Sequence, residues 1–308
     1  MPACAGRCSD KKSNTMDMQF VETSLLRIGY REWNPKGAQT IVLAHGWPDS
    51  IRCWHHVVPD LVQAGYRVVA PALRGFLPTT FLSDSTLRTG QLSALGRDMV
   101  EFVQALNLHQ PVLVGHDWGA RAVANACGLA PGIASHMVLI SVGYGTNDPL
   151  QSLSMEQTQL YWYHWFMATD RGQRTVRAEG KAFAQRMWDT WAPTGWYLPD
   201  EFEQTAMAFN TPDWAEVTLH SYQHRWGHAA PDLYYAQDEK ALHPAPVLDV
   251  ATLMLHGAVD GVSLPATSAN KEKFFSARYE RYLLPGVGHF PQRETPAKVA
   301  QAILNFLR

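Results

Sequence analysis

The stretch PVLVGHDWGARAVA, residues 111–124, most narrowly limits what this 308-residue chain can fold into. Its apolar beginning stops at GHDWG, residues 115–119, after which alanine and valine resume at helical spacing. Small residues at both ends of such a turn let a buried strand fold back into a helix. Asp117, between the two glycines, then projects above the sheet, and the N-terminus of the helix favours its ionised form. The pattern predicts a carboxylate nucleophile on a strained turn.

Near-continuous apolar runs that end in glycine-containing loops predict the strands of one sheet. They are TIVLAHG (40–46), YRVVAPALRG (66–75), PVLVGHD (111–117), HMVLISVG (136–143), ATLMLHGAVDG (251–261) and YERYLLPGVGHF (279–290). Continuous apolar runs indicate parallel strands that are covered on both faces. Apolar residues recur at helical spacing from Leu92 to Leu106, and Thr295 and Pro296 are typical of the N-cap and first turn of a last helix that runs to Leu307. We expect an α/β fold with a mostly parallel, doubly wound sheet.

The strand pattern stops between residues 146 and 240, where helical periodicity continues and most of the tryptophans and tyrosines lie. We expect residues 146–240 to form a helical cap that is inserted after the sixth strand. Residues 17–145 and 241–308 would then form the core. Residues 1–16 are small and polar, which predicts a disordered leader.

Composition and charge exclude several classes of partner. The formal net charge is −2 and no basic stripe is interleaved with aromatic residues, so we expect no nucleic-acid partner. No apolar run approaches the roughly 18–20 residues that cross a bilayer, and the N-terminus lacks the apolar region of a signal peptide, so we expect no membrane association. The four cysteines form no CxxC pair, which indicates free thiols in the cytoplasm and no metal site. We expect no cofactor, and a homodimer stays open.

Further motifs supply partners for Asp117 in an order typical of a catalytic triad. The motif HGWP ends a predicted strand, and the backbone N–H of Trp47 would form an oxyanion hole with the N–H of Trp118. Asp260 follows another strand end in HGAVDG, and His289 lies in LPGVGHF just before the last helix. The order nucleophile, acid, base predicts that Asp260 orients His289, and that His289 acts as the base.

From about residue 20 to its C-terminus the chain resembles the α/β-hydrolase superfamily. GHDWG together with HGWP resembles the branch of epoxide hydrolases and haloalkane or haloacetate dehalogenases, whose nucleophile is an aspartate. The resemblance implies an α/β-hydrolase fold in which Asp117 attacks an sp³ carbon and forms an alkyl-enzyme ester. His289 would then deprotonate a water that attacks the ester carbonyl. In some relatives the acid follows the sixth strand, and Asp148 is therefore the alternative to Asp260.

The reaction depends on what stabilises the leaving atom. An epoxide opens to an alkoxide, and a phenol with a pKa of about 10 is protonated at neutral pH and can donate to it. Epoxide hydrolases that resemble this chain use two cap tyrosines, of which Tyr222 in HSYQHRWG matches one. The other position falls near Trp162, a departure that leaves Tyr161, Tyr163 and His164 open. We take Tyr163 as the catalytic partner and the other two as substrate-binding residues.

Dehalogenases of the same branch use other groups. Haloalkane dehalogenases hold the halide with indole N–H donors, for which Trp118 and Trp165 are candidates. Haloacetate dehalogenases clamp the substrate carboxylate with two arginines and use a cap His-Trp pair. Here His164-Trp165 matches that pair and Arg121 matches one arginine, but Trp118 stands in the place of the other. The absence of one arginine would weaken the binding of the substrate carboxylate by about 1.5–3 kcal/mol, which disfavours a haloacetate substrate.

We therefore predict an epoxide hydrolase that acts on a small apolar substrate and water. A haloalkane or haloacetate dehalogenase with the same Asp-His-Asp triad is the alternative. A third hypothesis is a non-catalytic relative that binds a small hydrophobic signal under the cap, although no member of the triad is lost from the sequence.

Overall fold

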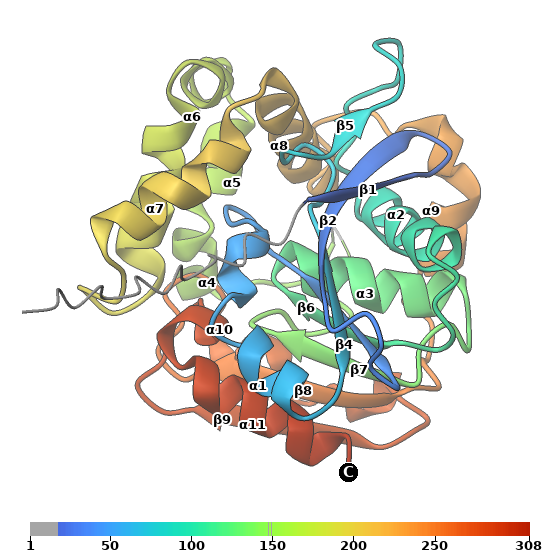
Figure 1. The fold of residues 1–308 in the computed structure, drawn as a ribbon. Coiled ribbons are helices and arrows are strands. Elements are labelled where there is room, and N and C mark those ends of the chain that lie inside the picture. Colours follow the sequence, from blue (N-terminus) through green and yellow to red (C-terminus); the bar gives the residue numbers. More distant parts are fainter. Residues whose placement is uncertain (1–17, 147, 149) are drawn as a thin grey trace, which may run out of the picture.

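A computed structural model describes residues 18–146, 148 and 150–308, and within these ranges one nine-stranded sheet forms the centre of the molecule (Figure 1). Its strands are β1 (Gln19–Glu22), β2 (Leu26–Trp33), β3 (Thr40–Ala44), β4 (Arg67–Pro71), β5 (Thr80–Phe81), β6 (Val112–His116), β7 (His136–Ile140), β8 (Ala251–Gly257) and β9 (Tyr279–Leu284). They lie in the order β1-β2-β4-β3-β6-β7-β8-β9, and β5 pairs with β2 beside this path.

The prediction of a mostly parallel sheet is confirmed, because every neighbouring pair from β4 to β9 is parallel. Strands β1, β2 and β5, which pair antiparallel at one edge, are not among the predicted strands. The reason lies in their exposure. Leu26, Ile28 and Tyr30 of β2 are buried, but Arg27 between them is exposed and the last residues of the strand are only half-buried. A strand with this pattern has no continuous apolar run to mark it.

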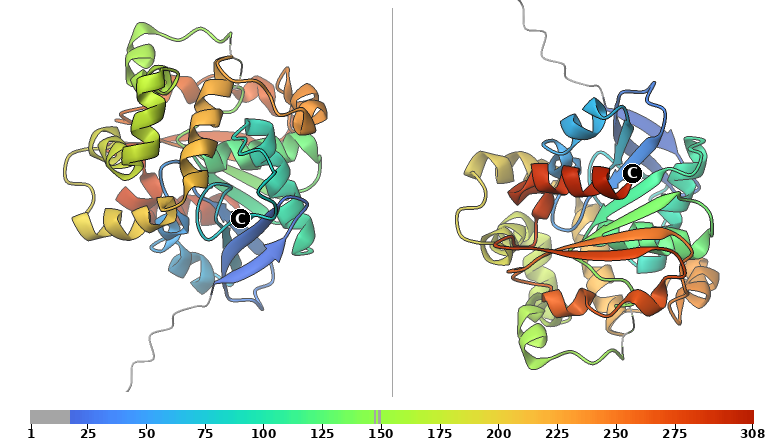
Figure 2. Two further views of the ribbon diagram at one scale, coloured as in Figure 1. Left: turned by 90° about the horizontal axis from the view of Figure 1, so that it is seen from above. Right: turned by 90° about the horizontal axis from the view of Figure 1, so that it is seen from below.

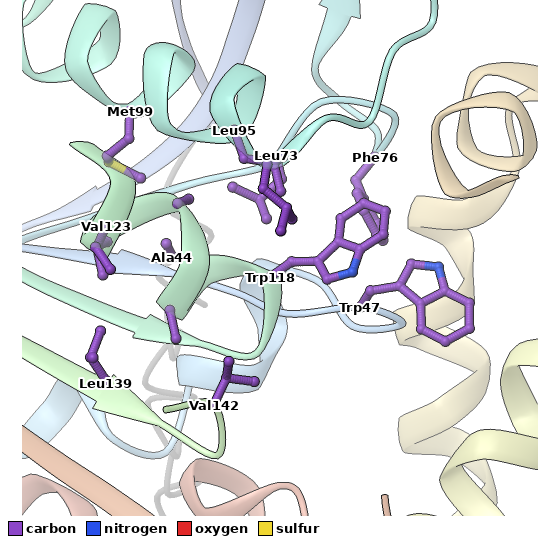
Figure 3. Close-up of a cluster of buried hydrophobic side chains, with 14 of the residues drawn as sticks. Ala44, Trp47, Leu73, Phe76, Leu95, Met99, Trp118, Val123, Leu139 and Val142 are labelled. Atoms are coloured by element: carbon purple, nitrogen blue, oxygen red, sulfur yellow. The ribbon is translucent and has the colours of Figure 1, made fainter. Parts of the chain in front are cut away.

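Helices cover both faces of the sheet, because successive residues of each strand point to opposite sides. Val42 and Ala44 of β3 belong to an apolar cluster with α2 (Leu92–Ala105) and α3 (Trp118–Leu129), part of which Figure 3 shows. Ile41 and Leu43 belong to a second cluster with α1 (Val58–Gln63) and α11 (Pro296–Phe306). Figures 1 and 2 show α3 and α11 on opposite sides of the sheet, as a doubly wound fold requires.

The chain between β7 and β8 is helical in its described residues. Its helices are α4 (Met155–Leu160), α5 (Trp162–Met167), α6 (Asp170–Trp191), α7 (Pro199–Ala206), α8 (Pro212–Arg225) and α9 (Ala236–Leu242). We call α4 to α8 the cap helices; they gather on one side of the sheet (Figure 1). The insertion follows the sixth strand if the two-residue β5 is not counted.

Helix α9 packs on the core helices α2 and α3, although the predicted cap extends to residue 240. An ion pair between Arg97 of α2 and Asp238 of α9 joins the two elements. The division into 17–145, 146–240 and 241–308 stays a prediction. Residues 1–16, expected to form a disordered leader, lie outside the described residues.

The last helix begins as predicted at Pro296, with Thr295 in the N-cap position, but the Thr295 side chain makes no capping hydrogen bond. A short helix, α10 (Pro291–Glu294), directly precedes it. The remaining helical turns are the 3₁₀ helices η1 (Ile51–Trp54), η2 (Met207–Phe209), η3 (Leu233–Tyr235), η4 (Pro265–Ser268) and η5 (Glu272–Phe274). Among the helices of the described ranges, none combines the length and the apolar character that crossing a membrane requires.

Candidate active site

Asp117 lies on the turn between β6 and α3 in a strained conformation, with φ of 49° and ψ of −112°. Such an angle costs free energy in a residue other than glycine and is typical of functional turns. Gly115 permits the turn, since a Cβ there would overlap the backbone of Gly119. Gly46 lets the loop after β3 approach Asp117, since a Cβ at position 46 would lie only 2.6 Å from the Cβ of Asp117. The sequence therefore forms the predicted elbow and places a buried carboxylate at its tip.

The two oxygens of Asp117 have different neighbours. Oδ1 accepts a hydrogen bond from the backbone N–H of Trp47 at 2.9 Å. Oδ2 lies 3.7 Å from Nε2 of His289. The Trp118 N–H begins α3 directly after Asp117. A carbonyl oxygen in the place of Oδ1 would thus lie beside at least one donor of the expected oxyanion hole, and the part of Trp118 in that hole stays a prediction.

The structure brings His289 and Asp260 together, although they lie in separate loops. Nδ1 of His289 lies 2.8 Å from Oδ2 of Asp260, so the imidazole presents its other nitrogen to Asp117. Oδ1 of Asp260 accepts hydrogen bonds from the backbone N–H groups of Val262 and Ser263, at 2.9 and 2.8 Å. The carboxylate is therefore held at both of its oxygens. The alternative acid, Asp148, is exposed and its Oδ1 accepts from the N–H of Leu150.

Glu294, which the sequence analysis did not single out, holds the loop of His289. Its two carboxylate oxygens accept from the backbone N–H groups on either side of the histidine, Gly288 at 2.7 Å and Phe290 at 2.9 Å. The N–H of His289 itself donates to the carbonyl of Trp191, the last residue of α6, at 3.0 Å. The imidazole is therefore positioned by both the core and a cap helix.

The charges of the three residues stabilise one another. Burial raises the pKa of Asp117, but hydrogen bonding to His289 and its charge outweigh this effect and lower that pKa to about 2. Burial also raises the pKa of Asp260, and the charge of His289 holds it well below its usual range. Burial lowers the pKa of His289, yet the charges of Asp260 and Asp117 raise it to about 10. At neutral pH the site holds two carboxylates on either side of an imidazolium.

A second histidine lies against Asp260. Nε2 of His256 lies 2.8 Å from the carbonyl oxygen of Ser263 and 3.3 Å from Oδ2 of Asp260. Because both of these oxygens accept, Nε2 carries a proton. Nδ1 lies 2.7 Å from Oγ of Ser268, which in turn accepts from Nε of Arg281. These contacts hold His256 against Oδ2 of Asp260, the same oxygen that His289 contacts.

Tyr222 of α8 lies against Trp118, the residue that follows Asp117. Its hydroxyl oxygen accepts a hydrogen bond from the indole N–H of Trp118 at 3.2 Å, so the phenolic proton is left for another acceptor. Tyr163 of α5 lies with its ring centroid 5.3 Å from that of Tyr222 and is stacked on Trp47. Burial raises the pKa of both phenols, and the charge of Asp117 raises that of Tyr222 further. Both phenols therefore stay protonated beside the carboxylate.

Tyr161 and His164 lie behind this pair, with their rings stacked 4.3 Å apart. Nδ1 of His164 accepts a hydrogen bond from the indole N–H of Trp226 at 3.0 Å, which places the proton of the neutral ring on Nε2. Burial and the charges of two arginines hold the pKa of His164 well below its usual range. Nε2 is enclosed and has no hydrogen-bond partner among the described residues. His164 is thus a neutral donor near Tyr222, whose ring centroid is 4.5 Å away.

Two of the predicted substrate-binding residues have other contacts. The indole N–H of Trp165 donates to the carbonyl of Thr158 at 2.9 Å. Trp165 therefore does not offer the halide donor that a dehalogenase of this branch would need there. Nη1 of Arg121, a residue of α3, donates to Oγ1 of Thr146 at 3.2 Å. Trp47 connects the core and the cap, because its indole N–H donates to Thr218 of α8 at 2.9 Å (Figure 3 shows Trp47 beside Trp118).

No group of three or more histidine, cysteine or acidic side chains in the described part of the chain is arranged to hold a metal ion. Cys53 and Cys127 are buried free thiols. The groups that the site itself offers for chemistry are its carboxylates, its imidazole and its phenols.

Several known proteins are similar to this chain over most of its length. A family model described as the alpha/beta hydrolase fold matches residues 39–296. A solved structure of a proposed epoxide hydrolase from Klebsiella pneumoniae has a TM-score of 0.89 and 36% sequence identity, and covers 94% of this chain and 96% of that chain. Epoxide hydrolase A of Mycobacterium tuberculosis is 24% identical over 314 residues, which cover 94% of this chain and 96% of that protein. An epoxide hydrolase of Caballeronia sordidicola is 26% identical over 297 residues, 87% of either chain.

A doubly wound sheet with a carboxylate at the elbow and an aspartate–histidine pair beside it defines the class. The chain belongs to the α/β-hydrolase superfamily. Within the superfamily it belongs to the epoxide hydrolase branch, to which the similarity over nearly its whole length assigns it.

Proposed function

We propose that the protein is an epoxide hydrolase that converts a small apolar epoxide and water into a diol. The observation that carries the proposal is the contact between Trp118 and Tyr222. The residue next to Asp117 holds the hydroxyl of a cap tyrosine, so a carboxylate that attacks carbon and a phenol that donates a proton face the same space. An epoxide needs these two groups at once, because its C–O bond opens to an alkoxide.

The first step joins the substrate to Asp117. Oδ2 attacks an epoxide carbon, the C–O bond to the ring oxygen breaks, and the oxygen takes a proton from Tyr222 or Tyr163. The product of this step is an ester whose carbonyl oxygen, Oδ1, lies at the Trp47 N–H. Esterification removes the negative charge that faces Nε2 of His289, so the pKa of this imidazole falls and it gives its proton to the tyrosine phenolate.

The second step releases the diol. Nε2 of His289 takes a proton from water, the hydroxide adds to the ester carbonyl carbon, and the oxyanion forms at Oδ1. Collapse breaks the bond between the carbonyl carbon and Oδ2, and the diol oxygen takes the proton from His289. Asp117 emerges as a carboxylic acid, whose proton passes to Nε2 of His289 and restores the starting imidazolium. Asp260 stabilises the imidazolium in this step and stays ionised.

Two contacts weigh against the dehalogenase alternative. The indole N–H of Trp165 is directed to Thr158, and the indole N–H of Trp118 is directed to the hydroxyl of Tyr222. Both of the expected halide donors are thus engaged within the protein. A departing halide also needs no proton, which would leave the buried phenols without a role.

The test is intact-protein mass spectrometry on the His289→Gln variant, which should form the Asp117 ester and hydrolyse it slowly. The variant is exposed separately to a panel of epoxides and to a panel of halogenated alkanes and acids. A mass gain equal to the whole epoxide supports the proposal. A gain equal to the substrate without hydrogen halide shows a dehalogenase, and no adduct with any compound favours the relative that only binds a hydrophobic molecule.

We propose a cytoplasmic location on the separate ground of cysteine chemistry. Cys53 and Cys127 are buried thiols without a disulfide partner among the described residues, and burial raises the pKa of both. Such thiols are typical of a reducing compartment. A homodimer stays a prediction, to be checked by light scattering.

A further inference from the structure

Arg225, the last residue of α8, is a buried cation without an acidic partner in the described part of the chain. The residue is 8% exposed. Its Nε and Nη2 atoms are enclosed and have no hydrogen-bond partner among the described residues. Its guanidinium carbon lies 4.9 Å from the ring centroid of Tyr222. The contact with the ring is favourable but gives these N–H groups no acceptor. Burying a charged group without hydrogen-bond partners costs free energy of folding.

Two other buried arginines of the same chain show what such a side chain normally contacts. In Arg74, Nε and Nη2 donate to the two oxygens of Asp98, each at 2.6 Å. In Arg293, Nε and Nη2 donate to the two oxygens of Asp49, at 2.9 and 2.6 Å. The two nitrogens that are unpartnered in Arg225 are therefore the pair that holds a carboxylate elsewhere in this molecule. Two parallel N–H groups match the two oxygens of a carboxylate.

A second cation increases the positive potential around Arg225. Arg121 of α3 is also buried, and burial together with repulsion from Arg225 lowers the pKa of Arg121 to about 10. The same two charges add to the effect of burial on the pKa of His164. Two cations that repel each other in a buried region favour the binding of an anion between or beside them.

Space for a ligand adjoins Arg225. A cavity of about 400 Å³ lies between α2, α3, α8 and α9, and Arg225, His224 and Lys240 are among the residues that line it. Its apolar side is formed by Leu92 and Leu242. Glu239 also lines the cavity, but its Oε1 already accepts hydrogen bonds from Gln91 and Ser93. The cavity is large enough for a small organic acid, whose hydrocarbon part would contact the leucines.

We propose that Arg225 forms a carboxylate-binding site beside the catalytic tyrosine: its side chain turns toward the adjoining cavity, and its Nε and Nη2 atoms donate to the two oxygens of the ligand. The carboxylate belongs either to the substrate, which would then be an epoxide of a short-chain carboxylic acid, or to a separate organic acid that binds beside Tyr222. The first source rests on the proposed function, since it assumes that the chain hydrolyses epoxides.

The experiment compares 5,6-epoxyhexanoate with 5,6-epoxyhexanamide, which differ in charge and hardly in size. The kcat/KM of both is measured for the wild type, Arg225→Met, Arg225→Lys and the control Arg177→Met, whose guanidinium pairs with Glu216 on the exposed face of the cap helices. If the carboxylate is the substrate's own, the wild type prefers the acid by roughly 10- to 100-fold. Arg225→Met then removes the preference through KM, Arg225→Lys keeps part of it, and Arg177→Met keeps all of it.

The second arm measures a separate acid. Sodium acetate is titrated at constant ionic strength, with calorimetry for binding and turnover of the neutral amide for effect. If the ligand is a free carboxylate, acetate binds the wild type and changes that turnover, and Arg225→Met abolishes both responses. Melting temperatures show whether Arg225→Met folds, and we expect no loss of stability, because a methionine of similar volume replaces an unpaired buried charge.

The outcomes separate this inference from the proposed function. Equal kcat/KM for acid and amide, together with no binding of acetate to the wild type, overturns the carboxylate site and leaves epoxide hydrolysis standing. Failure to hydrolyse either epoxide contradicts the proposed function, and acetate calorimetry on wild type and Arg225→Met then decides the carboxylate site by itself. A lower melting temperature of Arg225→Met with unchanged substrate preference would show a structural role and overturn the proposal.

Discussion

Nε2 of His289 lies 3.7 Å from Oδ2 of Asp117, whereas Oδ1 of the same carboxylate is held at 2.9 Å by the N–H of Trp47. The contacts distinguish the two oxygens before any substrate binds. Oδ2 faces His289, and Oδ1 lies where the proposed mechanism requires the carbonyl oxygen of the ester. The proposed mechanism therefore assigns the new bond to Oδ2 and the oxyanion to Oδ1.

The first prediction follows from this assignment. In a single turnover in H₂¹⁸O with enzyme in excess, we expect the diol to carry no label and Asp117 to gain one ¹⁸O atom. The oxygen of the diol comes from Oδ2, and water replaces it in the carboxylate. Mass spectrometry of the diol and of the peptide that contains Asp117 checks the prediction. Label in the diol after one turnover would show direct attack of water on the epoxide.

The second prediction concerns the two phenols. We expect Tyr222→Phe and Tyr163→Phe each to slow ester formation by roughly 10²- to 10⁴-fold, the usual contribution of a general acid. Hydrolysis of the ester, once formed, should change much less. Rapid-quench measurement of the Asp117 ester separates the two steps. Tyr197→Phe is the control, since its hydroxyl donates to Asp189 at the cap surface; a similar loss in that variant would contradict the assignment.

A third prediction concerns pH. Burial raises the pKa of Asp117, but its contacts with His289 lower that pKa to about 2. The carboxylate is therefore ionised, and ester formation should not fall as the pH drops from 7 to about 4. In His289→Gln the imidazolium charge no longer opposes burial, so the pKa of Asp117 rises and we expect ester formation to fall already between about pH 7 and 5. Single-turnover rates across this range check the shift; identical acid limbs in both proteins would refute it.

The same charges act on stability with opposite signs at the two ends of the pH scale. The raised pKa of His289 stabilises the fold below its unfolded value near 6.5, and this contribution is lost as the pH rises toward about 10. The lowered pKa of Asp117 stabilises the fold above its unfolded value near 3.8 and is lost as the pH falls toward about 2. We expect the melting temperature of the wild type to decrease from pH 7 to 10 by more than that of His289→Gln.

His256 gives a fifth prediction. Its Nε2 lies 3.3 Å from Asp260, and it does not touch the proposed nucleophile, so it acts as a positioning residue. We expect His256→Asn to slow hydrolysis of the ester, because Asp260 holds His289 less firmly, while ester formation stays near the wild-type rate. Accumulation of the ester during steady-state turnover is the signature. A variant that slows both steps equally would instead indicate a general loss of structure.

Much of the fold could be predicted because its central strands are buried on both faces. Strands β3, β4, β6, β7, β8 and β9 coincide with continuous apolar runs of the sequence. Strand β2 was not predicted, because the exposed Arg27 interrupts its apolar residues. The positions of Asp117, Asp260 and His289 followed from glycine-containing turns at strand ends, which are local signals. The distances between these three side chains could not be predicted from the sequence, because they depend on how the separate loops pack in the fold.

The cap could not be resolved in the same way. Tyr161, Tyr163 and His164 lie within four positions, so neither hydrophobicity nor periodicity could separate them. Their different contacts depend on α8, which follows about 50 positions later in the chain. Arg225 was equally hidden, because a basic residue in the last turn of a helix ordinarily satisfies the helix C-terminus. Only its burial without an acidic partner in the described residues distinguishes it.

Trp47 contacts both sides of the reaction space, with its backbone N–H at Asp117 and its indole N–H at Thr218 of α8. For anyone who wishes to redesign the protein for bulkier molecules, this double attachment sets a boundary. A substitution that pushes α8 outward would displace Trp47, whose backbone N–H receives the oxyanion in the proposed mechanism. A pocket widened at α8 would therefore lower the turnover rate. Helix α6 sets a second boundary, because the carbonyl of its Trp191 accepts from the N–H of His289 and its Trp188 donates to the carbonyl of Pro48, next to Trp47.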